Sequence, residues 1–390
     1  MIKKDTFGLV CSGGGAHGAY QVGVLKYIHE KFSYQEASPF RIFAGSSCGA
    51  LNTTFYAAQS WDAVHSRLWL EDMWLHFHVP GYHGNIVKNM MKSLYQQWRN
   101  KHDERMAAWS LLSPAPMKDI IQKGFQRAHL DKAFSSQTTL GAAIAATELV
   151  SGRCCWFQEG ETASEWNLFH SIGIQTKLTP AHLEASCSVP IFLPPVKIDK
   201  HYYVDGSVGM DRPLAAAVIM GATRILTIAT DQPVSFQLPE YPPTFRPKFS
   251  NMFRMLMNRL SRDPARDEAV QLQLLNRFYL ALSRRKKKQG GKDIYPLFHD
   301  ESLPSHYKPV HVYMFYPSKR IRDYYGLEKH IPGAPKRTRF MFHNRFIHEM
   351  IELGYEDAHS RHQELKDFFI PPANKRWLFF RRQHLKDKAA

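Results

Sequence analysis

The chain has 390 residues, of which 44% are hydrophobic and 13% aromatic. A chain of this length and composition can bury one large core or two smaller ones, which excludes disorder throughout. Lys and Arg outnumber Asp and Glu by 51 to 35, a formal net charge of +16, and this excess favours an anionic partner, either nucleic acid or an acidic membrane surface.

The cysteines and the apolar runs restrict the cellular setting. The five cysteines are an odd number without paired spacing, so the sequence predicts neither a disulfide framework nor a CxxC metal site. The N-terminal segment has only a short apolar run before glycines follow, which is typical of a first strand and not of a secretory signal. No later run approaches the roughly 18 apolar residues that cross a bilayer. We therefore expect a cytoplasmic protein that meets any membrane from one side.

Strand-like runs recur along the chain with helical segments between them. The runs occupy residues 7–11, 41–44, 139–147, 202–204, 225–229 and 310–315. Between the first two runs, residues 19–32 have the apolar spacing of an amphipathic helix. This alternation predicts an α/β fold, with a sheet that carries helices on its faces.

A glycine-rich segment at residues 13–18, GGGAHG, follows the first strand. Consecutive glycines let bare backbone N–H groups approach an oxygen that bears negative charge, as an oxyanion hole requires. The candidate donors are Gly13, Gly14 and Gly15. A tight turn without chemistry is the alternative.

The same segment also matches GxGxxG, the dinucleotide-binding fingerprint. That fingerprint requires an acidic residue at the end of the second strand, where it holds a ribose hydroxyl. Here the second strand ends in Ala44-Gly45-Ser46-Ser47, and Glu36 lies before that strand. The sequence therefore disfavours a nucleotide site.

Residues 45–49 read GSSCG, a GxSxG motif between the second strand and a predicted helix at 50–59. A nucleophile on a tight strand-to-helix turn needs small flanking residues, because a Cβ at Gly45 or Gly49 would crowd the neighbouring strand and helix. Such a turn projects the Ser47 hydroxyl and points the backbone N–H of Cys48 toward the same space. We interpret Ser47 as a candidate nucleophile.

From about residue 52 to 136 the sequence becomes helical, aromatic and rich in histidine. We predict a helical layer or cap inserted into the sheet. Its tryptophans have a simpler explanation as core residues.

A serine hydroxyl is a poor nucleophile until a base takes its proton, and histidine or a carboxylate can serve. The chain has 20 histidines, and no motif singles one out, so a Ser-His-Asp triad stays open. Asp205 comes directly after the run 202–204, where a carboxylate could face Ser47 across adjacent strand ends. A plain Asp-Gly turn is the alternative.

Beyond a proline-rich connection at 232–247 we predict two helices, the second with Asp263 as N-cap and Pro264 at its first position. That helix ends in the basic run 284–288. This run and the tail 375–382, which mixes aromatics with arginines, are candidate contacts to anionic lipid. A solvated surface run and a tail packed on the domain are the alternatives.

The chain has a glycine loop first, then the GxSxG turn and much later Asp205. This arrangement resembles that of the patatin-like phospholipases. The resemblance covers roughly residues 5–231 and, more faintly, 352–358. Residues 185–190, ASCSVP, and 192–196, FLPPV, are similar to the stretch before the catalytic Asp of that family.

The resemblance implies a three-layer α/β/α sandwich with a mainly parallel sheet, and catalysis by a Ser-Asp dyad without histidine. It implies Ser47 as nucleophile, Asp205 as base and the glycine loop as oxyanion hole. Two positions depart from the family. His17 stands where Arg or Lys is usual, so cationic help there would depend on pH, and Ser207 stands where Gly or Ala is usual.

We therefore expect a lipid acyl hydrolase of phospholipase A or lysophospholipase type that needs no cofactor or metal. The expected division is a catalytic domain at 1–231 and a helical, basic region at 232–390 packed on the same domain. The expected partners are a lipid substrate and an anionic membrane surface, since no nucleic-acid module is recognised. A histidine-dependent α/β-hydrolase for soluble esters and a non-catalytic lipid-binding protein are the alternatives.

Overall fold

The computed structural model describes residues 5–32, 37–76, 110, 113–168, 170–232, 252, 264–288, 309–318, 321 and 342–370. Within them a ten-stranded sheet has the order β10-β9-β1-β2-β3-β4-β6-β5, with β8 paired to β3 and β7 to β8. The strands are β1 (Phe7–Cys11), β2 (Ile42–Ser46), β3 (Gly141–Glu148), β4 (Cys154–Glu159), β5 (Trp166–Leu168), β6 (Ser171–Gln175), β7 (Val196–Ile198), β8 (His201–Asp205), β9 (Arg224–Ile228) and β10 (His311–Phe315). The run from β10 to β3 is parallel throughout.

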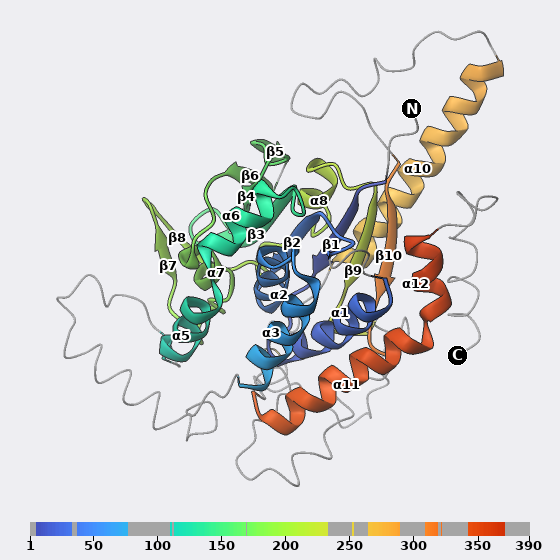
Figure 1. Ribbon diagram of the computed structural model, residues 1–390. Helices are drawn as coiled ribbons and strands as arrows, with labels where there is room; N and C mark the ends of the chain where they lie inside the picture. The colour runs from blue at the N-terminus through green and yellow to red at the C-terminus, as the bar shows by residue number, and fades with distance from the viewer. Residues whose placement is uncertain are drawn as a thin grey trace, which may run out of the picture.

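Helices cover both faces of the sheet (Figure 1). One face carries α1 (Gly18–Phe32), α2 (Cys48–Ala58), α3 (Ala63–Leu75), α5 (Ala115–Gly124), α6 (Arg127–Ser135), α7 (Pro180–Ser186), α11 (Asn344–Ser360) and α12 (His362–Phe369). The other face carries α8 (Ala215–Ile219) and α10 (Ala265–Lys288). The chain is therefore a three-layer α/β/α sandwich, which confirms the predicted fold class.

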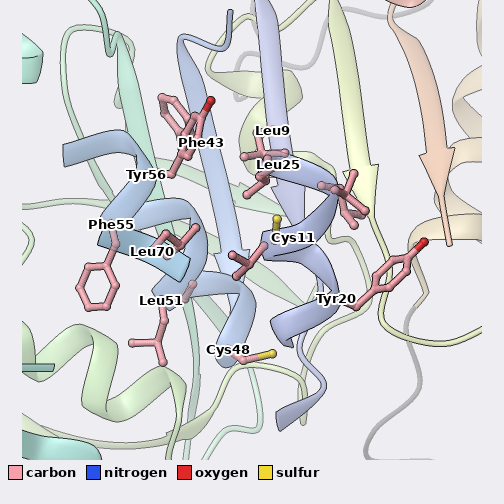
Figure 2. Close-up of a cluster of buried hydrophobic side chains, with 14 of the residues drawn as sticks. Leu9, Cys11, Tyr20, Leu25, Phe43, Cys48, Leu51, Phe55, Tyr56 and Leu70 are labelled. Carbon is pink, nitrogen blue, oxygen red and sulfur yellow. The ribbon is translucent and has the colours of Figure 1, made fainter. Parts of the chain in front are cut away.

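The core is divided by the sheet, because successive residues of a strand point to opposite faces. Leu9 and Cys11 of β1 belong to one buried cluster, and Val10 between them belongs to the other. Figure 2 shows part of the first cluster, where Leu9 and Cys11 lie near Leu25 of α1. The central strands are buried on both faces, as parallel strands usually are.

The six predicted strands are all present, with ends that differ by a few residues. Strands β4, β5, β6 and β7 were missed. β5 and β7 have three residues each, too few to form an alternating pattern. In β6 a glycine, Gly173, interrupts the run, and the indole of Trp166 fills the space where its side chain would be.

Two described elements of the C-terminal part, β10 and α11, pack on elements of the N-terminal part. β10 pairs with β9 in the same sheet, and α11 crosses α1 at very close range. A Cβ on Gly23 would overlap the carbonyl oxygen of Ile351, and one on Gly354 would overlap that of Tyr20. The Tyr20 hydroxyl donates to Asp357 Oδ2 at 2.9 Å. The first helix of the chain is thus covered by one of the last.

Other sequence predictions fall outside the described residues. They are Asp263, the first of the two predicted C-terminal helices except for residue 252, nearly all of the proline-rich connection, and the tail 375–382. The second C-terminal helix is confirmed as α10, although the side chains of 284–288 are not described. No helix among the described residues combines the length and apolarity that crossing a bilayer demands.

Candidate active site

β2 and β8 pair with consecutive parts of the same side of β3. Their ends meet there, and this places the GxSxG turn beside the Asp-Gly turn. β4 occupies one edge of β3. On the other edge β2 runs parallel until Ser46 lies opposite Ala145. There β8 arrives antiparallel, with Asp205 opposite Ala146. Ser46 and Asp205 therefore face adjacent residues of one strand, and the residues that follow each of them meet.

Ser47 occupies the turn between β2 and α2 in a conformation that side chains rarely adopt, with φ 55° and ψ −130°. Its N–H donates to Ser186 Oγ at 2.9 Å. Its carbonyl accepts the N–H groups of Ala50 and Leu51 at 2.9 and 3.2 Å. A strained turn of this kind is held by its surroundings and is typical of a nucleophile elbow.

The glycines that flank Ser47 allow a close approach of backbone to backbone. A Cβ on Gly45 would overlap the backbone of Gly49, and one on Gly49 would overlap the carbonyl of Cys11 at the end of β1. The predicted steric reason for glycine at both positions is therefore confirmed.

Asp205 is the buried last residue of β8. Its Oδ1 accepts the N–H of Ser207 at 2.8 Å, and its own N–H donates to the carbonyl of Ser188 at 2.8 Å. Ser207 Oγ lies 3.1 Å from Ser46 Oγ. The turn that carries Asp205 is thus hydrogen-bonded directly to the residue before Ser47.

The glycine loop lies against Ser47. A Cβ on Gly13 would stand 3.0 Å from Ser47 Cβ and would overlap Ser207 Oγ. Gly14 packs on the side chain of Thr230, whose hydroxyl donates to the carbonyl of Gly13 at 2.7 Å. Gly15, with φ 60°, begins the short 3-10 turn η1 (Gly15–His17). A side chain at Gly13 would therefore close the space beside Ser47, and one at Gly14 would overlap Thr230.

A buried amide network holds the two ends of this loop, and no sequence motif revealed it. Gln21 Nε2 donates to the carbonyls of Ser12 and Ile228 at 2.8 and 3.0 Å. Asn52 Nδ2 donates to Gln21 Oε1 at 2.8 Å and to the carbonyl of Gly18 at 3.0 Å. Asn52 lies on α2, so the network ties the glycine loop to the helix that Ser47 begins.

The side chains around the site are largely uncharged. Burial raises the pKa of the Cys11 and Cys187 thiols well above their usual range, and the Asp205 charge adds to the shift at Cys187. Thiols of this kind remain protonated and unreactive at neutral pH. Cys48 is also buried, and its Sγ contacts the carbonyl of Ser12 at 3.8 Å.

His17 is buried at the end of the glycine loop, where its Nδ1 lies 3.6 Å from Asp231 Oδ1. Its ring also packs near Phe346 of α11. His17, one of the two residues that depart from the family pattern, thus has a carboxylate beside it. In the described part of the chain, no three His, Cys, Asp or Glu side chains gather as metal ligands would.

Ser186 and Ser207 were not predicted as site residues. The stretch 185–190 carried a family signal, but its spacing gave no hint that the Ser186 hydroxyl would accept from Ser47. No sequence pattern marked Gln21 as a site residue either. Its partners are the carbonyls of Ser12, which follows β1, and of Ile228, which ends β9.

Comparison with known proteins identifies the family. The family model described as patatin-like phospholipase matches residues 9–218, more than half of the chain. No curated protein matches significantly. Among solved structures, VipD from Legionella pneumophila is similar at 13% identity and a TM-score of 0.37, over 93% of this chain and 67% of that one. Human GIVD cytosolic phospholipase A2, in complex with methyl gamma-linolenyl fluorophosphonate, is similar at 9% identity and a TM-score of 0.42. That match covers 94% of this chain and 59% of the human one.

Proposed function

The chain belongs to the patatin-like phospholipase family, and from this premise we propose that it is a lipid acyl hydrolase with Ser47 as nucleophile and Asp205 as base. We propose the phospholipase A or lysophospholipase type, acting on fatty-acyl esters. The observation that carries the proposal is the meeting of β2 and β8 on one edge of β3, with Ser46 and Ser207 in contact.

In the first half of the reaction, Asp205 takes the proton of Ser47 Oγ as that oxygen attacks the ester carbonyl. The negative charge that develops on the carbonyl oxygen is held by N–H groups of the Gly13–Gly15 loop and of Cys48. One such donor typically lowers the barrier by about 3 kcal/mol. When the tetrahedral intermediate collapses, Asp205 returns the proton to the departing alkoxide. The lyso-lipid or alcohol leaves, and an acyl-enzyme remains.

In the second half, Asp205 removes a proton from a water molecule that attacks the acyl carbonyl. The same donors hold the second oxyanion. Collapse returns the proton to Ser47 Oγ and releases the fatty acid. Each step uses groups of the chain itself, so no metal or cofactor enters the scheme.

The amide network supports this chemistry through the backbone. Gln21 and Asn52 fix the carbonyls at both ends of the glycine loop, so that the donors need no reorientation as charge develops. The strained turn at Ser47 is fixed in the same way by Ser186. We propose that the enzyme works at the cytoplasmic surface of an anionic membrane, which suits its formal charge of +16.

The test measures fatty-acid release from mixed phospholipid vesicles in the presence of a chelator. Ser47→Ala and Asp205→Asn are each expected to lower release by about a thousandfold or more, while circular dichroism shows an unchanged fold. Asp211→Asn, at an exposed aspartate shortly after Asp205, is the matched control and should retain full activity.

Other outcomes would contradict parts of the proposal. Release that survives Asp205→Asn would reject the dyad and direct attention to a histidine. No release from any acyl ester by the unaltered chain would favour a non-catalytic lipid-binding role.

A further inference from the structure

Large apolar side chains are exposed just beyond the active-site end of β3. Val150, at the tip of the β3–β4 connection, is 91% exposed, and Leu149 beside it is 49% exposed. Tyr202 at the start of β8 is 43% exposed. Leu149 and Tyr202 are adjacent, because the Leu149 N–H donates to the Tyr202 carbonyl at 2.8 Å. Turn tips usually carry polar residues or glycine, so three such neighbours form an unusual surface.

The strand register gives the position of this surface relative to the site. Asp205 lies opposite Ala146 of β3, and Tyr203 lies opposite Glu148. Leu149 and Tyr202 therefore lie three residues beyond the Ala146–Asp205 pair, in the direction in which β3 runs. At about 3.3 Å per residue, the apolar tip stands roughly 10 Å beyond the level of Asp205. The apolar tip lies at the carboxyl-terminal end of the parallel strands, and Ser47 lies at that same end.

Cations accompany the apolar residues. Lys197 of β7 pairs with Tyr202 of β8, and its ammonium group lies 5.7 Å from the centre of the Tyr202 ring. Lys200 is exposed at the β7–β8 turn. The carboxylate of Glu148 is turned into the β3–β4 connection, where the N–H and O–H of Ser151 donate to it. These hydrogen bonds lower the pKa of Glu148, so the group stays charged, but they hold its carboxylate within the turn. Asp199, exposed beside Lys200, adds a second negative charge to this surface.

Ile191 is another exposed apolar side chain, three residues after Ser188 in the loop that leads to β7. It is 49% exposed and adopts φ 73°, a conformation that a β-branched residue rarely takes. Its loop follows Ser188, whose carbonyl accepts the N–H of Asp205. An exposed, strained and apolar residue beside a site favours a functional explanation.

We propose that Leu149, Val150, Tyr202, Lys197 and Lys200, here called the docking edge, bind an anionic lipid bilayer and present the Ser47 site to it. The inference rests on the proposed lipid hydrolase function and names its membrane-binding surface. The apolar tips enter the boundary between headgroups and acyl chains, the tyrosine ring lies at headgroup level, and the lysines pair with anionic headgroups. An ester carbonyl drawn from the bilayer then has only a short path to Ser47.

The opposite edge of the sheet provides a matched control. Asn276 of α10 bonds to Val310, just before β10 begins, so this part of α10 lies at the amino edge. Leu274 and Phe278 on the same helix are also exposed, by 58% and 53%. α10 continues away from the sheet toward residues 284–288 (Figure 1). A bilayer bound at the docking edge would therefore not reach Leu274 or Phe278.

Vesicle binding should be measured in the Ser47→Ala background, so that lipid is not consumed, with vesicles of phosphatidylcholine alone and of an equimolar mixture with phosphatidylserine. Leu149→Ser combined with Val150→Asp is expected to weaken binding to the mixed vesicles roughly tenfold or more. Lys197→Glu combined with Lys200→Glu should remove most of the preference for phosphatidylserine. Leu274→Ser combined with Phe278→Ser should bind unchanged.

With Ser47 restored, the docking-edge variants should lose hydrolysis of vesicle lipid and keep hydrolysis of a soluble butyrate ester. Three results would each overturn the inference: failure of the Ser47→Ala chain without further changes to bind mixed vesicles, unchanged binding by the docking-edge variants, or loss of binding in the α10 control alone. Absence of all ester hydrolysis would instead reject the proposed function, because binding is scored without catalysis.

Discussion

Individual side chains at the site mainly fix backbone groups. The conformation of Ser47 costs of order 1–3 kcal/mol, and the hydroxyl of Ser186 on one side and the first turn of α2 on the other hold it in place. The His182 side chain likewise stabilises the start of α7, because its Nδ1 accepts the N–H of the N-cap residue Thr179 at 3.0 Å. α7 ends at Ser186, so a residue four positions away supports the contact to Ser47.

His182 predicts a pH dependence of stability. Burial lowers its pKa from 6.5 to about 4. As the pH falls below 6.5, the unfolded chain takes up a proton that the folded chain excludes, and the folded state loses stability until the pH reaches about 4. This residue alone is expected to lower the free energy of unfolding by about 3 kcal/mol over that interval. Urea denaturation at several pH values measures it.

His182→Gln is the matched control for that measurement. Glutamine at this third helical position keeps an acceptor for the Thr179 N–H, as in a capping box, and it does not titrate. The variant should therefore lose this part of the pH dependence. An unchanged dependence would show that other groups cause the acid sensitivity.

Among the elements, the crossing of α1 and α11 allows the least variation. Gly23 and Gly354 each face the backbone of the other helix, so the two axes approach more closely than side chains would permit. Around this contact, the Tyr27 hydroxyl lies 2.9 Å from His362 Nδ1, and the Tyr355 hydroxyl donates to Glu30 at 2.8 Å. The helix that follows the glycine loop is thereby fixed along its whole length.

Gly354→Ala is expected to force the two helices apart. Its Cβ would overlap the Tyr20 carbonyl oxygen, and overpacking of this kind typically costs about 2 kcal/mol. The midpoint of urea denaturation should fall accordingly. Glu352→Ala, at an exposed position of α11, should leave it nearly unchanged, and equal midpoints for the two variants would contradict the close crossing.

At the scale of the whole molecule, the described elements beyond residue 232 belong to the structure that carries the site. β10 extends the parallel sheet beside β9. Phe368 and Phe369 of α12 pack on Phe7 at the start of β1. The buried Asp357 of α11 also accepts the N–H of Ser318 at 2.8 Å. These contacts join β1 to α12 and β10 to β9 in one core.

A chain that ends at residue 231 is therefore expected not to fold. It would expose Tyr20, Phe7 and Phe32, which α11, α12 and β10 cover, and it would leave β9 as an unpaired edge. Near-ultraviolet circular dichroism and solubility of the truncated chain provide the test. Cooperative unfolding of residues 1–231 alone would show instead that the predicted catalytic domain is independent.

The sequence predicted the parts of the fold that local patterns encode. Six strands, the helix after the glycine loop and the turn at Ser47 all have local signatures of alternation or glycine placement. The end-to-end meeting of β2 and β8 does not, because it depends on an antiparallel pairing between residues 146–148 and 203–205. Gln21 likewise has no local signature on an amphipathic helix, because its role depends on the carbonyls of Ser12 and Ile228, which belong to separate parts of the chain.

The contact between Tyr20 and Asp357 spans 337 positions, and this separation sets an order of events during synthesis. A ribosome that adds roughly 5–20 residues per second needs tens of seconds to reach α11 after α1 has emerged. During that interval the segment with Ser47 already exists, yet the helix before it lacks its cover. The finished site can therefore form only after most of the chain has left the ribosome.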